Sequence, residues 1–215
     1  MVVVSAITFD FNGTLSDDEP ILCGIFQALF AERGRPLTED EYYDHLAGLS
    51  DAAIVEGWLG ADYPDVAGAV AERIRRYCAL VADGSTIDER AREAVRHASA
   101  SVPLAVVSGA ALAEIAPVLA AAEIAGCFRT VVSADLVRQG KPHPESYHIA
   151  LERLGAVPGE AVAFEDTEAG VASAKAAGMR CIAVRRTVAA ERLGRADELI
   201  EAIDVGVVRR VLAEP

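Results

Sequence analysis

The sequence predicts an α/β fold, a doubly wound parallel sheet flanked by helices, with a helical segment inserted after the first strand. Short apolar runs alternate with helical patterns from about residue 83 onward, and this alternation is typical of right-handed βαβ units in a parallel sheet. Residues 16 to about 82 contain helical patterns and no convincing strand. We therefore predict a core formed by residues 1–15 and 83–215 and a helical insertion formed by residues 16–82.

The strands are predicted from apolar runs that end in polar or glycine-containing segments. The first run extends from Val2 to Phe9 and is followed directly by Asp10. Short apolar runs bounded by turn signals are typical of buried strands in a parallel sheet. Four further strands and a short edge strand are expected at Leu104–Val107, Thr130–Val132, Ala161–Phe164, Cys181–Val184 and Glu198–Ile200.

The insertion is predicted to hold four helices, because its apolar residues recur at helical spacing. Gly34 is the expected C-terminal cap of the first helix, and Thr38 with Glu41 fits a capping box for the second. The third helix is expected to end at Gly60, and the fourth to run from about residue 66 to 81.

Helices of the core are expected to separate its strands. Pro117 lies inside one of these segments, so that helix is expected to be kinked or to start later. The four segments lie near residues 88–98, 111–122, 145–154 and 168–177.

Composition restricts the partners of this chain. Hydrophobic residues make up 52% of the 215 residues, which favours a packed core over disorder. The net charge of −13 argues against nucleic-acid or anionic-membrane binding, so we expect a small-molecule partner. Four cysteines without a C-x-x-C pair, and no signal or membrane-spanning segment, indicate free thiols and a cytoplasmic location. No pattern in the sequence indicates an oligomeric state.

Polar residues suited to phosphate chemistry follow several predicted strands. Asp10 and Asn12 follow the first strand, Ser108–Gly109 follows the second, and Glu165–Asp166 follows another. Lys141 precedes a predicted helix. Since the carboxyl ends of parallel strands share one edge of the sheet, these residues are expected to converge there.

This set of residues favours phosphoryl transfer. Aspartate is an established covalent nucleophile for phosphoryl groups, and Asp10 is placed to serve as one. Oxygen ligands from Asp10 and Asp166 favour Mg²⁺ over zinc. Lys141, the Ser108 hydroxyl and the backbone N–H groups of the Asn12–Gly13 and Ser108–Gly109 loops are suited to hold phosphate oxygens.

The motifs resemble those of the haloacid dehalogenase (HAD) superfamily, within it the β-phosphoglucomutase and phosphoglycolate-phosphatase-like group. The resemblance covers residues 4 to about 184. Its four motifs, in chain order, match Asp10-Phe11-Asn12-Gly13-Thr14 (D-x-D-G-T), Ser108 after a strand, Lys141 between Gly140 and Pro142, and Glu165-Asp166-Thr167-Glu168-Ala169-Gly170 (E-D-[ST]-x-x-G). It implies a Rossmann-like core, an α-helical cap formed by the insertion, and Mg²⁺-dependent hydrolysis of a small phosphate monoester such as a sugar phosphate.

The resemblance also implies roles for single residues. Asp10 would form an aspartyl-phosphate, and Ser108 with Lys141 would hold the phosphoryl group. Asp166 would bind Mg²⁺ together with the backbone carbonyl of Asn12, and Glu165 would lie close by as a ligand or an acceptor. Gly170 would let the following helix pack close to the metal-binding loop.

Asn12 departs from the motif, which has a proton-transferring aspartate at this position. Loss of general acid–base catalysis costs roughly 10²–10⁴ in rate, or about 3–5 kcal/mol of barrier. Three explanations remain open. Asn12 is native and the enzyme is slow or uses substrates with good leaving groups; Asn12 was introduced to trap a complex; or the protein has lost catalysis and binds a phosphorylated ligand or a partner protein.

Two further residues argue against a sugar phosphomutase. Leu22 stands where the mutase carries a hinge histidine, and Asp51 replaces the basic residue of its substrate loop, which disfavours a second phosphate. A mutase would also need proton transfer at Asn12.

A phosphonatase would need a lysine in the cap, but Lys141 and Lys175, the lysines of this chain, lie outside the insertion.

Overall fold

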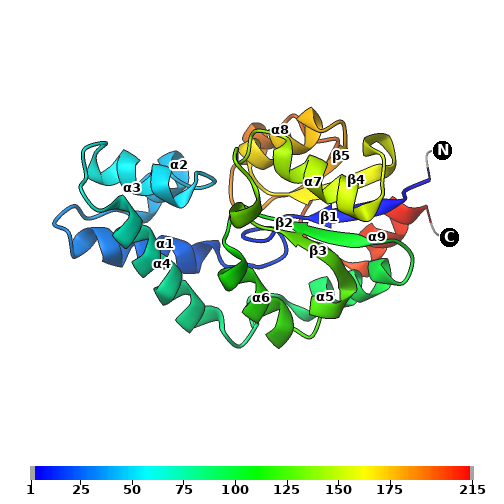
Figure 1. The fold of residues 1–215 in the computed structure, drawn as a ribbon, viewed down its shortest axis with the longest axis horizontal. Helices are drawn as coiled ribbons and strands as arrows, with labels where there is room; N and C mark the ends of the chain where they lie inside the picture. The colour runs from blue at the N-terminus through cyan, green and yellow to red at the C-terminus, as the bar shows by residue number, and fades with distance from the viewer. Residues whose placement is uncertain (1–2, 214–215) are drawn as a thin grey trace.

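The computed structural model describes residues 3–213, which form a parallel sheet with helices on both faces and a group of inserted helices beside it (Figure 1). The strand order is β3-β2-β1-β4-β5-β6, and every pairing is parallel. The strands are β1 (Ala6–Phe9), β2 (Leu104–Val107), β3 (Phe128–Val132), β4 (Ala161–Glu165), β5 (Arg180–Val184) and β6 (Glu198–Ile200). The predicted doubly wound α/β fold is therefore confirmed; Val2, in the predicted first strand, lies outside the described residues.

The helices of the described residues fall into two groups. The inserted helices, between β1 and the rest of the core, are α1 (Glu19–Ala31), α2 (Glu39–His45), α3 (Asp51–Leu59) and α4 (Val66–Val81). The core helices are α5 (Glu89–Ser99), α6 (Leu112–Ala121), α7 (Glu145–Leu154), α8 (Glu168–Ala176) and α9 (Val205–Leu212). Single 3₁₀ turns lie at Ala125–Cys127, Ala134–Leu136, Pro158–Glu160 and Ala190–Leu193.

The two faces of the sheet differ in side-chain size. Large side chains such as Ile7, Phe9 and Phe164 pack with α5, α6 and α9 on one face. The opposite face carries smaller residues, including Ala105 and Ala163, and packs against α7 and α8. Successive strand residues point to opposite faces, so this alternation places a helical layer on each side, as Figure 1 shows.

The strand order places the polar strand ends at one crevice. β1 lies between β2 and β4, and the chain winds outward from β1 in one direction before it crosses over to β4. The gap between the carboxyl ends of β1 and β4 is therefore the topological switch point, where open α/β sheets bind ligands. Phe9 and Phe164 pair in register and stack with their ring centroids 5.0 Å apart, which sets Asp10 beside Glu165.

The inserted helices have an apolar core of their own. It is formed by buried side chains from α1, α2, α3 and α4, among them Phe26, Tyr42 and Val55. The capping box of Thr38 and Glu41 at α2 is confirmed, and so is the end of α3 at Gly60. The prediction that Gly34 caps α1 is wrong: α1 ends at Ala31, and Gly34 takes its positive φ of 74° after one further turn.

One core helix was not predicted, and another contains a proline. α9 was not predicted; its valines have low helix propensity, and it is stabilised by packing of Val208 and Val211 into the core and by Asp204, which accepts from Val207 N. α6 keeps Pro117 in its interior. Proline cannot donate to the Ala113 carbonyl, and the Cys78 thiol of α4 donates to that carbonyl instead, at 3.7 Å.

The four cysteines of the chain are free thiols, as predicted; they are Cys23, Cys78, Cys127 and Cys181. Within residues 3–213, none of the helices combines the length and the apolar character needed to cross a membrane.

Candidate active site

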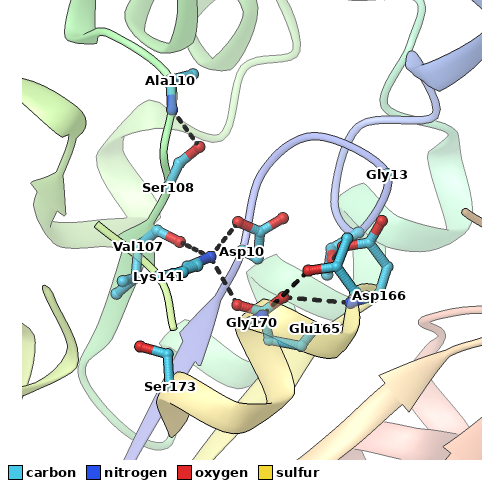
Figure 2. Close-up of polar contacts among 12 residues, drawn as sticks. Asp10, Gly13, Val107, Ser108, Ala110, Lys141, Glu165, Asp166, Gly170 and Ser173 are labelled. Carbon is cyan, nitrogen blue, oxygen red and sulfur yellow. Dashed lines mark hydrogen bonds and ion pairs between the residues drawn. The ribbon is translucent and has the colours of Figure 1, made fainter. Parts of the chain in front are cut away.

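Lys141 and three carboxylates meet at the switch point of the sheet. Asp10 follows β1, Glu165 ends β4, Asp166 follows it, and Lys141 reaches in from the loop before α7. The Lys141 Nζ lies 2.5 Å from Asp10 Oδ1, 2.6 Å from Glu165 Oε1 and 3.0 Å from the Val107 carbonyl oxygen, to all of which it donates (Figure 2). Residues up to 156 positions apart in sequence are thus brought together, as the strand-end pattern predicted.

Burial and charge together set the protonation of this cluster. Burial alone would lower the pKa of Lys141, but the carboxylates of Asp10 and Glu165 outweigh it and raise that pKa, so Lys141 stays protonated. Burial raises the pKa of Glu165 to about 7, against the opposing charge of Lys141. Burial and the charge of Asp10 also raise the pKa of Asp166 well above its usual range. The cluster therefore favours binding of a further cation.

The donor set fits a divalent metal ion. Carboxylate oxygens of Asp10, Glu165 and Asp166 all lie within 4.8 Å of one another, and all three residues are buried. Thr14 Oγ1 donates to Asp166 Oδ1 at 2.9 Å, and Thr187 donates to Asp166 Oδ2, so Asp166 is held in orientation by two hydroxyls. An all-oxygen set of high negative charge is the kind that Mg²⁺ prefers.

Two glycines make room for these carboxylates. A Cβ atom on Gly13 would lie 2.0 Å from Asp166 Oδ2, and Gly13 has a φ of +71°. A Cβ atom on Gly170, in α8, would lie 1.9 Å from Glu165 Oε2. Any side chain at either position would displace a carboxylate of the cluster. Gly170 thus lets α8 pack against Glu165 at the end of β4.

The predicted phosphate-binding residues differ in how they are placed. Ser108 and Gly109 line the same cavity as Asp10 and Lys141. Ser108 Oγ also accepts a hydrogen bond from Ala110 N at 3.1 Å, which orients the hydroxyl (Figure 2). The Gly13 N–H donates to Asp18 Oδ1 at 3.1 Å.

A cavity of about 300 Å³ extends from the carboxylate cluster to the inserted helices. At its far end Arg73 of α4 pairs with Asp51 of α3 at 2.5 Å and with Glu114 of α6. Glu19, in the first turn of α1, accepts from Tyr42 OH at 2.8 Å. Burial raises the pKa of Glu19 to about 7, against the hydrogen bond from Tyr42. Leu22, Phe26, Leu49 and Ile54 also line this end of the cavity. Its lining is therefore mixed, and its arginine is already paired with two carboxylates.

Asn12 lines the cavity, but its amide group is engaged elsewhere. The Asn12 Nδ2 donates to Asp18 Oδ2 at 2.9 Å and to Tyr77 OH at 3.2 Å. Tyr77 OH itself donates to Asp18 Oδ2. The Tyr77 ring packs with the main core rather than with the core of the inserted helices.

Sequence reasoning did not assign Asp18 a role, although its position just before α1 is a recognisable N-cap position. Its side chain caps no helix and contacts the Asn12–Gly13 turn instead. Arg73 and Thr187 were not predicted as site residues either, because no motif contains them and only the fold brings them to the site.

Comparison with known proteins agrees with the motifs. Residues 7–184 match the model of the haloacid dehalogenase-like hydrolase family. The chain is 30% identical over 185 residues to a phosphorylated carbohydrates phosphatase of Thermotoga maritima, covering 83% of this chain and 84% of the relative. It is 27% identical over 186 residues to a phosphoglycolate phosphatase of Pseudomonas putida, covering 82% of this chain and 67% of the relative.

A solved structure agrees with the sequence relatives. The fold is similar to the crystal structure of CbbY from Rhodobacter sphaeroides in complex with phosphate, with a TM-score of 0.81 and 28% identity, covering 93% of this chain and 95% of that chain. The resemblance predicted from four short motifs thus extends over most of the molecule. This chain belongs to the haloacid dehalogenase-like hydrolase family.

Proposed function

We propose that this protein is a Mg²⁺-dependent phosphohydrolase that cleaves a small phosphate monoester through an aspartyl-phosphate on Asp10. The observation that carries the proposal is the contact of Asp10 with Lys141, 2.5 Å apart, in a carboxylate cluster that opens into a cavity. The phosphatases among the relatives support the same reaction.

Each residue of the site has its own role in the proposed reaction. Asp10 attacks phosphorus and displaces the leaving group as an alkoxide, which takes its proton from solvent because Asn12 has none to give. Water then cleaves the acyl phosphate and regenerates the Asp10 carboxylate with release of inorganic phosphate. Lys141 keeps its positive charge beside Asp10 and offsets the repulsion between two anions. Ser108 and Gly109 bind phosphate oxygens. Asp10, Glu165, Asp166 and the Asn12 carbonyl would hold Mg²⁺, which neutralises phosphate charge and orients the phosphoryl group.

The substrate we propose carries one phosphate and a neutral, hydroxylated remainder. A second phosphate would need a free cation at the far end of the cavity, but Arg73 is paired there with Asp51 and Glu114. Glu19 and Asp51 are acceptors suited to hydroxyl groups. This argues against a sugar phosphomutase, which handles a bisphosphate.

We further propose that residues 16–82 act as a cap over a catalytic core of residues 1–15 and 83–215, in a cytoplasmic protein. Residues of α1, α3 and α4 line the cavity together with the strand ends, which supports a cap that selects the substrate.

Phosphate release from a panel of phosphorylated metabolites with Mg²⁺ tests the proposal. We expect hydrolysis of sugar monophosphates by the wild-type chain and none by Asp10→Asn. The second candidate is a catalytically disabled protein that binds a phosphorylated ligand or a partner protein. It is favoured by Asn12, whose amide cannot transfer a proton. That candidate predicts phosphate-ester binding without turnover by the wild-type chain.

A further inference from the structure

We infer that Asn12 and Asp18 are a matched amide–carboxylate pair, in which Asp18 is a positioning residue that requires an amide at position 12. The inference rests on the proposed function for its catalytic consequence only. It predicts that Asn12→Asp alone will not install a working carboxylate, whereas exchanging both residues will.

Asp18 is a buried acceptor that uses Asn12 as a donor. Its side chain is 0% exposed, and a carboxylate can only accept hydrogen bonds. Oδ2 accepts from Asn12 Nδ2 and from Tyr77 OH, and Oδ1 accepts from Gly13 N. Because Asp18 can only accept, the amide nitrogen of Asn12 must face it.

A carboxylate at position 12 does not fit beside Asp18. Asn12→Asp would set an acceptor 2.9 Å from an acceptor. The Tyr77 hydroxyl contacts both residues and can donate to one of the two. The Ser16 hydroxyl also lies beside Asp18, but it donates to Thr86. A buried acceptor without a donor is costly. The new carboxylate would turn away from Asp18 or distort the turn that carries Asp10.

The reversed pair satisfies every group of the network. In the double variant Asn12→Asp/Asp18→Asn, the new amide at position 18 donates to position 12 and accepts from Gly13 N through its oxygen. Tyr77 OH accepts from that amide and donates to the carboxylate. The carboxylate then occupies the position of the present Asn12 side chain, which lines the cavity.

A double-mutant cycle on unfolding, without Mg²⁺ or substrate, tests the pairing. We expect Asn12→Asp and Asp18→Asn each to lower the unfolding midpoint, and the double variant to recover most of the loss. Asp17→Asn combined with Asn12→Asp is the matched control, because it has the same net charge and Asp17 is exposed beside Arg186. Additive losses in the double variant, or equal recovery in the control, would overturn the pairing.

Leaving-group dependence tests the catalytic consequence. We expect the double variant to increase kcat/KM, which reports the first step, for an alkyl phosphate by roughly 10²–10⁴ over wild type, with a much smaller gain for p-nitrophenyl phosphate, whose leaving group needs no proton. A purely structural role would change both substrates alike. An equal gain in Asn12→Asp alone would overturn the inference. If no chain hydrolyses any ester, the proposed function fails, and the unfolding cycle still decides the pairing.

Discussion

Lys141 is the cation on which the carboxylate cluster depends. It lies between Asp10 and Glu165, and its side chain is 13% exposed. Removing one partner of a buried ion pair leaves an uncompensated charge, at a cost of about 3–5 kcal/mol.

We expect Lys141→Met to lower the free energy of unfolding by about 3 kcal/mol without Mg²⁺ and to abolish phosphate release. Denaturant unfolding and the phosphate assay measure the two effects. Lys175→Met is the matched control, because Lys175 pairs with Asp197 at a more exposed site. Equal stability of Lys141→Met and Lys175→Met would contradict the assigned ion pair.

Glu19 makes stability depend on pH. Its folded pKa of about 7, raised by burial from 4.5, means that the folded state binds more protons than the unfolded state between these values. The contribution of Glu19 is therefore present below about pH 4.5 and is lost as the pH rises through 7.

We expect Glu19→Gln to flatten the fall of stability between pH 4.5 and 7 and to be more stable than wild type at pH 8, by at most about 3 kcal/mol. A glutamine can still accept from Tyr42. Thermal unfolding across this pH range measures the slope. Glu168→Gln, at an exposed position, should leave the slope unchanged; a Glu19→Gln slope equal to wild type would show that Glu19 titrates normally.

Among the elements, α4 connects the inserted helices to the core. Its Arg73 pairs with Asp51 of α3 and Glu114 of α6, its Cys78 donates to the Ala113 carbonyl of α6, and its Tyr77 contacts Asp18. Arg73 and Glu114 are both buried, so we expect the loss of either partner to be costly.

We expect Arg73→Met to destabilise the protein by about 3–5 kcal/mol, because Glu114 would remain buried without its cation. Arg75→Met, two positions along the same helix at a mostly exposed site, should change stability by less than about 1 kcal/mol. Denaturant unfolding of both variants measures the difference. Comparable losses in the two would mean that the Arg73 contacts contribute little.

The elements also show what the sequence could predict. The strands were predicted because a buried apolar run is a local signal in the sequence. The motif residues were predicted to converge because they follow such runs directly and parallel strands share one carboxyl edge. α9 escaped prediction because tertiary packing, not helix propensity, stabilises it. The contact of Asp18 with Tyr77 joins residues 59 positions apart in the sequence, and a local sequence pattern does not indicate contacts over such a separation.

At the scale of the whole molecule, metal binding and stability should be linked. The three clustered carboxylates repel one another in the metal-free protein, and a ligand that binds only the folded state stabilises it by about 2.7 kcal/mol at a hundred times its Kd.

We therefore expect saturating Mg²⁺ to raise the unfolding midpoint of the wild-type chain. Asp166→Asn should lose this increment and yet be at least as stable as wild type without metal, because burial disfavours the Asp166 charge. Asp44→Asn, at an exposed position, should keep the increment. A Mg²⁺ response of Asp166→Asn equal to that of wild type would place the metal elsewhere.

Mass spectrometry of the acid-quenched protein during turnover tests the role of Asp10 most directly. With p-nitrophenyl phosphate the first step needs no proton from position 12, whereas Asn12 cannot activate water for the second step, so the aspartyl-phosphate should accumulate. We expect a phosphoryl group on the peptide that contains Asp10, sensitive to hydroxylamine and absent from Asp10→Asn. Turnover by the wild-type chain without a phosphoryl group on that peptide, or with the group on another residue, would contradict the assignment of Asp10 as the nucleophile.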